Sequence, residues 1–358
     1  MGSVTDVPLV RKTSTTLSDG RALHYFDDTE PYLSGRATRA LHDPRPPSPR
    51  AAPGGLRWDA RTGDWVTIAS ARMDRTHLPG PGENPLAPST ALRSTEIPAH
   101  DYDVVVFENR FPALPRCEVI CYSSDPAATV GSLPARRMRT VIEAWADRTA
   151  VLGAADGVEQ VFCFENRGVE TGVTLTHPHG QIYAYPFVPR EAATVLRRAR
   201  EHRTATGGNL LRERMLGELD AGTRVVASGR HWAAYVPHAA RWPVEVEVAP
   251  LRDVPDLCAL DDDERAELAF LYPELMARLD RYFSTADGAP IPLPYIAAWY
   301  QAPTAADDGD FRLHLRIMSM RRSPDKLKYL AGSESAMGAW INDAVPEEIA
   351  ARLREAAR

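Results

Sequence analysis

The same order of predicted elements occurs twice along the chain, and this repeat constrains the fold more than any other feature. In the first half, strands expected at 103–107 and 117–122 precede an amphipathic helix at 134–153 and strands at 158–164 and 181–185. In the second half, strands expected at 232–236 and 244–249 precede a helix at 260–283 and strands at 295–299 and 311–316. Because a repeated order predicts a repeated structural unit, we expect two similar halves, residues 1–206 and 207–358, each combining a sheet with helices.

Two histidines stand two residues apart in Thr176-His177-Pro178-His179-Gly180-Gln181, just before the strand expected at 181–185. Side chains alternate along a strand, so both imidazoles would point the same way. Gly180 allows a close approach of the backbone, and Gln181 forms hydrogen bonds without adding charge. This set suits an imidazole nucleophile at a phosphorus centre, with an amide beside the phosphoryl oxygens. The spacing alone also fits a metal-binding pair or structural histidines, so it leaves these interpretations open.

The composition narrows the class of protein. Apolar residues make up 44% of the 358 residues and charged residues 25%, as in soluble globular proteins. A net charge of −6 argues against a protein that coats nucleic acid, although local arginines can still bind a small anion. The sequence shows no signal peptide and no long apolar span. We therefore expect a cytoplasmic protein with no nucleic-acid or membrane partner.

A set of motifs identifies a family. Phe164-Glu165-Asn166-Arg167-Gly168, followed by His177-Pro178-His179-Gly180-Gln181, resembles the galactose-1-phosphate uridylyltransferase family, a branch of the histidine-triad superfamily. Further matching segments follow in the family's order at 62–75, 107–114, 231–243, 299–303 and 328–334. The resemblance implies an α+β, histidine-triad-like fold with two tandem halves, each having a mainly antiparallel sheet packed by helices.

The resemblance also implies a reaction. UMP would be exchanged between UDP-glucose and galactose-1-phosphate by a ping-pong mechanism through a covalent uridylyl-histidine. A neutral imidazole is a good nucleophile near pH 7, and its phosphoramidate stays reactive enough to pass the group on. The remaining catalysis is positioning of the substrates and stabilisation of charge on the phosphoryl oxygens. No metal is obligatory for that step.

Carried over position by position, the resemblance assigns roles to named residues. His179 is the nucleophile, Gln181 steadies the phosphoryl oxygens, and His177 supports the nucleophile through hydrogen bonds. The nucleotide and its phosphates would contact Arg72, Arg75, Asn109, Asn166 and Thr174. Lys328 and Glu334 would meet the hexose phosphate and the hexose hydroxyls. The alternatives without a role in binding are surface arginines at 72 and 75, turn residues at Asn109 and Asn166, and a basic surface run around Lys328.

The chain departs from the family at both of its metal sites. Many members hold zinc with a Cys-x-x-Cys pair, a downstream histidine and the first histidine of His-Pro-His. The matching positions here are Asn84, Ala87, Pro126 and His177, and one histidine does not hold zinc. A second site, built from a glutamate and three histidines in some members, matches Val195, Tyr300, His314 and Arg316. The four cysteines, Cys117, Cys121, Cys163 and Cys258, contain no Cys-x-x-Cys pair. We expect a protein without a metal or other cofactor.

These departures leave an alternative function open. The alternative function is that of a diverged paralogue that transfers or releases a nucleoside monophosphate from another nucleotide or sugar nucleotide in specialised metabolism. The residues do not separate that alternative from the uridylyltransferase.

The resemblance further implies a homodimer in which both chains contribute to each active site. The proline-rich arm at 43–55 is free in sequence terms either to wrap a partner or to remain disordered.

Overall fold

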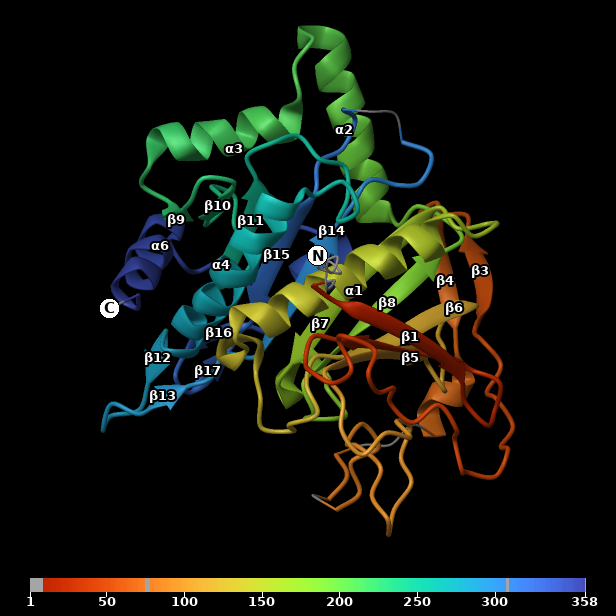
Figure 1. The fold of residues 1–358 in the computed structure, drawn as a ribbon. Coiled ribbons are helices and arrows are strands. Elements are labelled where there is room, and N and C mark those ends of the chain that lie inside the picture. Colours follow the sequence, from red (N-terminus) through yellow and green to blue (C-terminus); the bar gives the residue numbers. More distant parts are fainter. Residues whose placement is uncertain (1–8, 75–77, 81, 307–308, 358) are drawn as a thin grey trace, which may run out of the picture.

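The computed structural model describes residues 9–74, 78–80, 82–306 and 309–357 (Figure 1). These residues contain an 11-stranded sheet in the order β1-β2-β5-β6-β8-β7-β14-β15-β11-β10-β9. The N-terminal half contributes β1 (Arg11–Thr16), β2 (Ala22–Asp27), β5 (Val104–Glu108), β6 (Arg116–Cys121), β7 (Gln160–Arg167) and β8 (His179–Tyr185). The C-terminal half contributes β9 (Val225–Ser228), β10 (Trp232–Tyr235), β11 (Val244–Pro250), β14 (Tyr295–Tyr300) and β15 (His314–Ser319). Neighbouring strands in this sheet pair antiparallel, which confirms the α+β prediction.

The predicted repeat is visible in the sheet. The first half runs β5-β6-β8-β7 across the sheet, and the second half runs β10-β11-β15-β14. The strands β7 and β14 then pair with each other, with Arg167 opposite Tyr295. The two half-sheets therefore form one continuous sheet. The division expected at residues 206 and 207 falls between two helices and stays a prediction, because the sheet has no break there.

Two long helices, α1 (Ala135–Gly153) and α4 (Asp262–Asp280), cover one face of the sheet (Figure 1). The helix α1 matches its prediction of 134–153 to within one residue. The helix α4 is shorter than the predicted 260–283 at both ends, because Asp261 is its N-cap and Arg281 is its C-cap. The Asp261 side chain accepts the Glu264 N–H at 2.9 Å, and the Glu264 side chain accepts the Asp261 N–H at 2.9 Å. Pro273 lies inside α4, and the helix continues through it.

The remaining elements surround the sheet. The other helices are α2 (Arg190–Thr206), α3 (Leu210–Ala221), α5 (Gly332–Met337) and α6 (Pro346–Glu355), with short 3-10 turns at Ser70–Asp74, Val130–Ser132 and Val169–Thr171. Three small hairpins pair β3 (Gly55–Asp59) with β4 (Asp64–Ile68), β12 (Phe283–Ser284) with β13 (Pro290–Ile291), and β16 (Arg321–Ser323) with β17 (Lys326–Leu327). Among the described helices, none combines the length and apolar character needed to cross a bilayer.

The core between the helices and the sheet sets the orientation of β8. Ring centroids of Trp299 lie 6.0 Å from Trp145 of α1 and 6.2 Å from Trp232 of β10. On β8, Ile182 and Ala184 are buried in the same core. Because side chains alternate along a strand, His179, Gln181, Tyr183 and Tyr185 are only partly buried and face the other side of the sheet. The hydrophobic pattern of β8 thus decides where the predicted nucleophile points.

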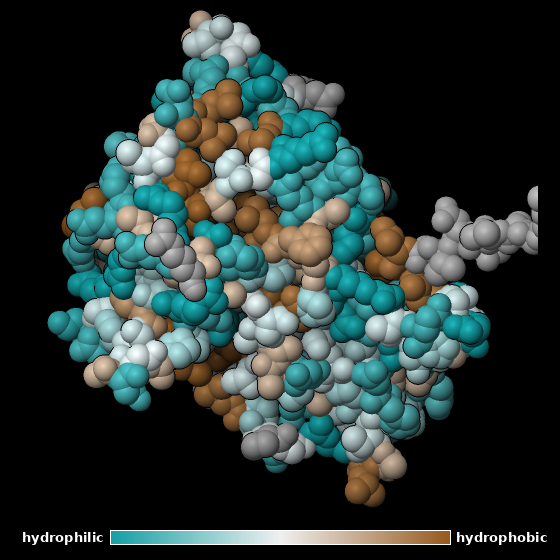
Figure 2. Space-filling view, turned by 60° about the vertical axis from the view of Figure 1, so that its left-hand side comes forward, coloured by the Kyte–Doolittle hydropathy of each residue, from teal (hydrophilic) through white to brown (hydrophobic). Residues whose placement is uncertain are grey.

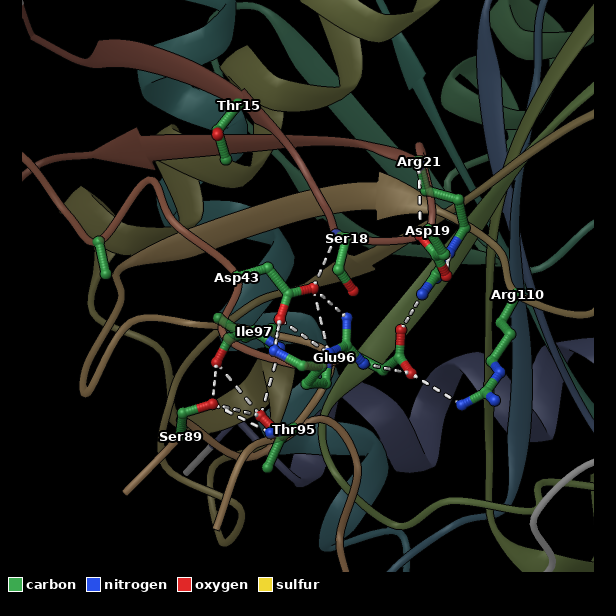
Figure 3. Close-up of polar contacts among 12 residues, drawn as sticks. Thr15, Ser18, Asp19, Arg21, Asp43, Ser89, Thr95, Glu96, Ile97 and Arg110 are labelled. Carbon is green, nitrogen blue, oxygen red and sulfur yellow. Dashed lines mark hydrogen bonds and ion pairs between the residues drawn. The ribbon is translucent and has the colours of Figure 1, made fainter. Parts of the chain in front are cut away.

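A buried ion-pair network fixes the proline-rich arm against the loop at 84–98 (Figure 3). The Glu96 carboxylate binds the guanidinium groups of Arg21 and Arg45, and Arg110 lies 3.5 Å away. Asp43 in the arm binds Arg45 at 2.8 Å and accepts the Ser18 N–H at 3.0 Å. Arg110 is half-exposed, but the other side chains in these contacts are largely buried, so their charges have partners where water is scarce. The start of the arm therefore packs on its own chain.

Candidate active site

His179 is the first residue of β8, and its ring is fixed by the backbone two residues earlier. The ring Nδ1 lies 2.7 Å from the carbonyl oxygen of His177. A carbonyl only accepts, so Nδ1 holds the proton and Nε2 keeps its lone pair. Burial also lowers the pKa of His179 below the ordinary 6.5, which favours the neutral ring. The local geometry therefore prepares Nε2 as a nucleophile.

His177 is buried and hydrogen-bonded through both ring nitrogens. Its Nε2 lies 2.8 Å from the carbonyl oxygen of Ser123 and 2.7 Å from the hydroxyl of Tyr102. Its Nδ1 lies 2.9 Å from the side-chain nitrogen of Asn84. Since the carbonyl of Ser123 must accept, Nε2 donates and Nδ1 accepts from Asn84. Burial lowers the pKa of His177 to about 4, so the ring stays neutral.

Gly180 lies on the buried face of β8, where the strand packs closely against its neighbours. A Cβ atom at this position would lie 2.1 Å from the Tyr122 hydroxyl and 2.7 Å from the carbonyl oxygen of Phe164. The sequence predicts that Gly180 allows a close approach of the backbone. The close neighbours are the Tyr122 hydroxyl and the Phe164 carbonyl, on the helix-covered side of the sheet. Because residue 180 has no side chain, β8 packs close to Tyr122 and Phe164, and this packing sets the position of the neighbouring His179.

Five of the predicted site residues line one cavity of about 160 Å³: Arg72, Asn109, Thr174, His179 and Gln181. Its apolar wall includes Leu86, Phe107, Phe111, Val119 and Leu175. An apolar wall with a few convergent polar groups is typical of a small-molecule site. Asn109 also accepts the Phe111 N–H at 2.9 Å, so it shapes the turn as well as the cavity. The structure therefore brings together segments that are far apart in the sequence.

A second cavity of about 230 Å³ meets the first at His179. Its lining includes Asn166, Arg167, Gly168, Thr176 and His177. Asn166 lies here, on β7, rather than in the cavity with Asn109. Arg167 donates to Asp280 at 2.6 Å, which anchors the end of β7. His179 lines both cavities, so a group attached to its ring would border both of them.

Comparisons with known proteins agree with this geometry. The family models described as "Galactose-1-phosphate uridyl transferase, N-terminal domain" and "C-terminal domain" match residues 115–189 and 195–358. A galactose-1-phosphate uridylyltransferase of Streptomyces lividans is 44% identical over 97% of this chain and 98% of its own length. The chain belongs to the galactose-1-phosphate uridylyltransferase family. It is an enzyme, a transferase of that family.

More distant relatives and solved structures match as well. A galactose-1-phosphate uridylyltransferase of Thermotoga maritima is 33% identical over 84% of this chain and 98% of its own length. A solved structure titled "Structure of uridylyltransferase" superposes with a TM-score of 0.74 at 28% identity, covering 84% of this chain and 98% of that one. An ADP-glucose phosphorylase from Arabidopsis thaliana, with bound ADP-glucose, shares the fold with a TM-score of 0.64 at 21% identity, covering 84% and 98% of the two chains.

The residues at the family's first metal site do not fit zinc in this chain. Asn84 offers an amide, and Ala87 and Pro126 offer no ligand atom. His177 uses its Nδ1 to accept from Asn84 and its Nε2 to donate to Ser123. A hydrogen-bond network therefore occupies both nitrogens of the remaining imidazole.

At the positions that match the family's second metal site, this chain has the guanidinium of Arg316. The rings of Tyr300 and His314 stack with centroids 5.0 Å apart. The Arg316 guanidinium lies 5.2 Å from the Tyr300 ring and contacts Glu245 at 2.8 Å and Glu191 at 3.3 Å. The Arg316 charge is matched by the two glutamates, and these ion pairs tie α2 to β11 and β15.

The repeat alignment needs a correction at His314. Sequence order alone pairs His314 with His177 and Arg316 with His179, because residues 311–316 take the place of the His-Pro-His segment in the repeat. In the structure, Nδ1 of His314 lies 2.9 Å from the carbonyl oxygen of Arg312, the same bond to residue i−2 that His179 makes. Both residues also begin their strands. His314 is therefore the counterpart of His179, and the earlier pairing was shifted by two residues because weak repeats lack a fixed register.

Lys328 and Glu334 meet each other, but they are not among the described residues that line either cavity. The Lys328 ammonium lies 2.9 Å from the Glu334 carboxylate and also donates to the Ile341 carbonyl. Lys328 is buried, so the alternative of an ordinary basic surface run is wrong for this residue. Nearby, Arg321 of β16 binds Glu170 at 2.9 Å. Arg75 lies outside the described residues, so its assignment stays a prediction.

Sequence reasoning missed two residues of the site. Tyr102 contacts His177, and the hydroxyl of Tyr183 lies between Arg72 and Gln181. The alternation along β8 could have indicated Tyr183, since it follows His179 and Gln181 on the same face. No sequence signal indicates Tyr102, which is 75 residues from His177 along the chain.

Proposed function

We propose that the protein transfers a uridylyl group from UDP-glucose to galactose-1-phosphate through a covalent intermediate on His179. The observation that supports this most strongly is the bond from His179 Nδ1–H to the His177 carbonyl. It leaves Nε2 unprotonated on a ring that lines both cavities. A neutral imidazole with one free nitrogen is the form that attacks phosphorus.

The proposed reaction has two steps. In the first, the Nε2 lone pair forms a bond to the α-phosphorus of UDP-glucose, the bond from that phosphorus to the bridging oxygen breaks, and glucose-1-phosphate leaves. In the second, a phosphate oxygen of galactose-1-phosphate attacks the same phosphorus and the N–P bond breaks. UDP-galactose forms, and His179 returns to its starting state. Gln181 and Arg72 donate hydrogen bonds to the phosphoryl oxygens, where negative charge increases in the transition state.

The two cavities suggest where each part of the substrate lies. The cavity beside Phe107, Val119 and Leu86 has an apolar wall suited to a nucleoside base. The cavity beside Asn166 and Gly168 is also lined by His179 and would hold the sugar phosphate. This arrangement lets one sugar phosphate leave and another enter while the uridylyl group stays in place. It therefore suits a ping-pong exchange.

We propose in addition that the enzyme works without a resident zinc ion. The support is the replacement chemistry at both positions: the Asn84 amide on His177, and the Arg316 guanidinium between Glu191 and Glu245. An amide and a guanidinium fill these places with directional hydrogen bonds rather than metal–ligand bonds. The two arrangements would hold the loop at 84–98 and the α2–sheet contact that metals hold elsewhere in the family.

We also propose a cytoplasmic homodimer whose active sites receive residues from both chains. Apolar side chains reach the surface at several places (Figure 2). On the β3–β4 hairpin, Trp58, Trp65, Val66 and Ile68 are all more than 40% exposed, and such clusters are typical of interfaces. A second copy would supply Lys328 and Glu334 to the sugar-phosphate cavity. The free thiols of the four cysteines fit a reducing compartment.

Intact-mass measurement tests the proposed reaction. The protein is mixed separately with UDP-glucose, ATP and UDP-N-acetylglucosamine. We expect a uridylyl adduct from UDP-glucose that is absent in His179→Asn and is discharged by galactose-1-phosphate. An adduct formed only from another nucleotide would replace this proposal with the diverged paralogue. No adduct from any of the three would reject covalent transfer.

A further inference from the structure

Tyr183 lies between two predicted phosphate-contacting residues. On β8 it follows Gln181 by two residues, so both side chains are on the same face of the sheet. Its hydroxyl lies 3.1 Å from Oε1 of Gln181 and 3.2 Å from Nη1 of Arg72. Arg72 precedes Tyr183 by 111 residues, in the 3-10 turn at Ser70–Asp74. Three side chains from two segments therefore form one series of hydrogen bonds at the edge of the cavity lined by Asn109 and His179.

The direction of this series of hydrogen bonds follows from the chemistry of its members. A guanidinium has only donors, so the Tyr183 oxygen accepts from Arg72. A phenol has a single O–H, and here it donates to Oε1 of Gln181. The carbonyl end of the Gln181 amide is thereby occupied. Its NH2 end is left to face away from Tyr183.

This direction matters because the two ends of a carboxamide have nearly the same shape but opposite polarity. With the NH2 end toward the substrate, Gln181 donates to a phosphoryl oxygen and stabilises its charge. In the flipped orientation, the carbonyl oxygen would face a phosphoryl oxygen and repel it. A glutamine without an orienting hydrogen bond would populate both orientations.

We infer that Tyr183 is a positioning residue for uridylyl transfer: its hydroxyl, oriented by Arg72, fixes the Gln181 amide with its NH2 group toward the reacting phosphate. This inference rests on the proposed function. Tyr183 itself does not touch the reacting atoms. Its contribution is the pre-organisation of a donor before the substrate arrives, which removes the need to select one amide orientation in each turnover.

The ring of Tyr183 is held independently of its hydroxyl. Its centroid lies 5.0 Å from the Phe164 ring in an edge-on contact and 6.1 Å from the Tyr185 ring. Replacing Tyr183 with phenylalanine therefore removes the hydroxyl and keeps these contacts. Tyr185 provides a matched control, because it lies on the same face two residues further along and outside the Arg72–Gln181 series.

The test measures the rate constant of uridylyl-adduct formation in a single turnover, using UDP-glucose, rapid quenching and intact mass. For Tyr183→Phe we expect a rate about 10 to 100 times lower at saturating UDP-glucose, and a half-saturating concentration within about threefold of wild type. Tyr185→Phe should stay within about twofold. Thermal unfolding of both variants reports whether they remain folded. A wild-type rate in Tyr183→Phe would overturn the inference.

A double-mutant cycle separates positioning from a general structural effect. If Tyr183 acts through Gln181, then removing its hydroxyl in a Gln181→Ala background has no amide left to misorient. We expect Tyr183→Phe to lower the rate of that background by less than about twofold. An equal factor in both backgrounds would show that Tyr183 acts independently, and would reject the inference. If wild-type protein forms no adduct at all, the proposed function fails first.

Discussion

The side-chain nitrogen of Asn84 lies 2.9 Å from Nδ1 of His177, at a position where other members of the family place a zinc ligand. The same amide accepts the Leu86 N–H at 3.0 Å through its oxygen. Asn84 therefore satisfies its own loop and the histidine at once. A hydrogen bond between two neutral groups therefore joins the loop at 84–98 to the segment that carries the nucleophile.

Purified protein should contain well below one zinc ion per chain when measured by inductively coupled plasma mass spectrometry. We expect a strong chelator to leave the rate of adduct formation unchanged, because Asn84 and His177 hold each other without a metal. A zinc-dependent family member treated in parallel serves as the control. About one zinc per chain, lost together with activity, would show that other residues have rebuilt a metal site.

His177 should make stability depend on pH in acid. Its pKa is lowered to about 4 in the folded protein from an ordinary 6.5, first of all by burial. Between these values the unfolded chain binds the proton and the folded protein does not, so the free energy of unfolding falls as pH falls. The loss should begin near pH 6.5, finish near pH 4, and reach about 3 kcal/mol. Urea unfolding across this range tests it. His177→Gln should show a shallower pH dependence, and an unchanged slope would contradict the assignment.

The rate of adduct formation should persist below the pH at which an ordinary histidine becomes protonated. Burial lowers the pKa of His179 below 6.5, so its nucleophilic neutral form remains as pH falls through that value. Single-turnover rates between about pH 5 and pH 8 should reach half of their plateau below pH 6.5. Circular dichroism at each pH separates this from acid unfolding. An acid limb at or above pH 6.5 would mean that the ring is not desolvated as described.

Gly180→Ala should reduce both stability and activity. The new Cβ would lie 2.1 Å from the Tyr122 hydroxyl and 2.7 Å from the Phe164 carbonyl oxygen, so β8 must shift. We expect the free energy of unfolding to fall by about 2 kcal/mol, and the adduct rate to fall at least about tenfold because His179 moves with the strand. Gly217→Ala is the matched control. Gly217 lies in α3 with open space around its Cβ position, so alanine should stabilise by about 0.5–1 kcal/mol.

Arg316→Met should destabilise the protein more than the loss of a surface ion pair. Arg316 contacts Glu245 at 2.8 Å, and the Glu245 side chain is only 2% exposed. Removing the guanidinium leaves a buried carboxylate without its ion-pair partner, which should cost about 3 kcal/mol in chemical unfolding. Arg197→Met removes an exposed pair with Glu201 and should change stability by less than about 1 kcal/mol. Equal effects of the two substitutions would show that the Arg316 cluster is not structural.

The residues of β8 illustrate how far the sequence reaches. Alternation of Gly180, Ile182 and Ala184 with His179, Gln181 and Tyr183 is a local pattern, and it predicts a strand with one buried face. The α1 pattern and the Asp261 cap are local in the same way. The repeat, however, was shifted by two residues at His314, because the register of a strand depends on partners that a linear pattern does not contain.

The sequence by itself determined the main strands and helices of the repeat, their two-part order and the His-Pro-His segment, because each is recorded in residues that are close along the chain. Only the tertiary structure decided that the two half-sheets join at β7 and β14, that the His179 proton lies on Nδ1, and that Arg316 pairs with two glutamates. It also decided which residues orient Gln181. The bond from Asn84 to His177 spans 93 residues and that from Arg72 to Tyr183 spans 111. Such contacts depend on how distant segments pack, and local periodicity contains no information on that packing.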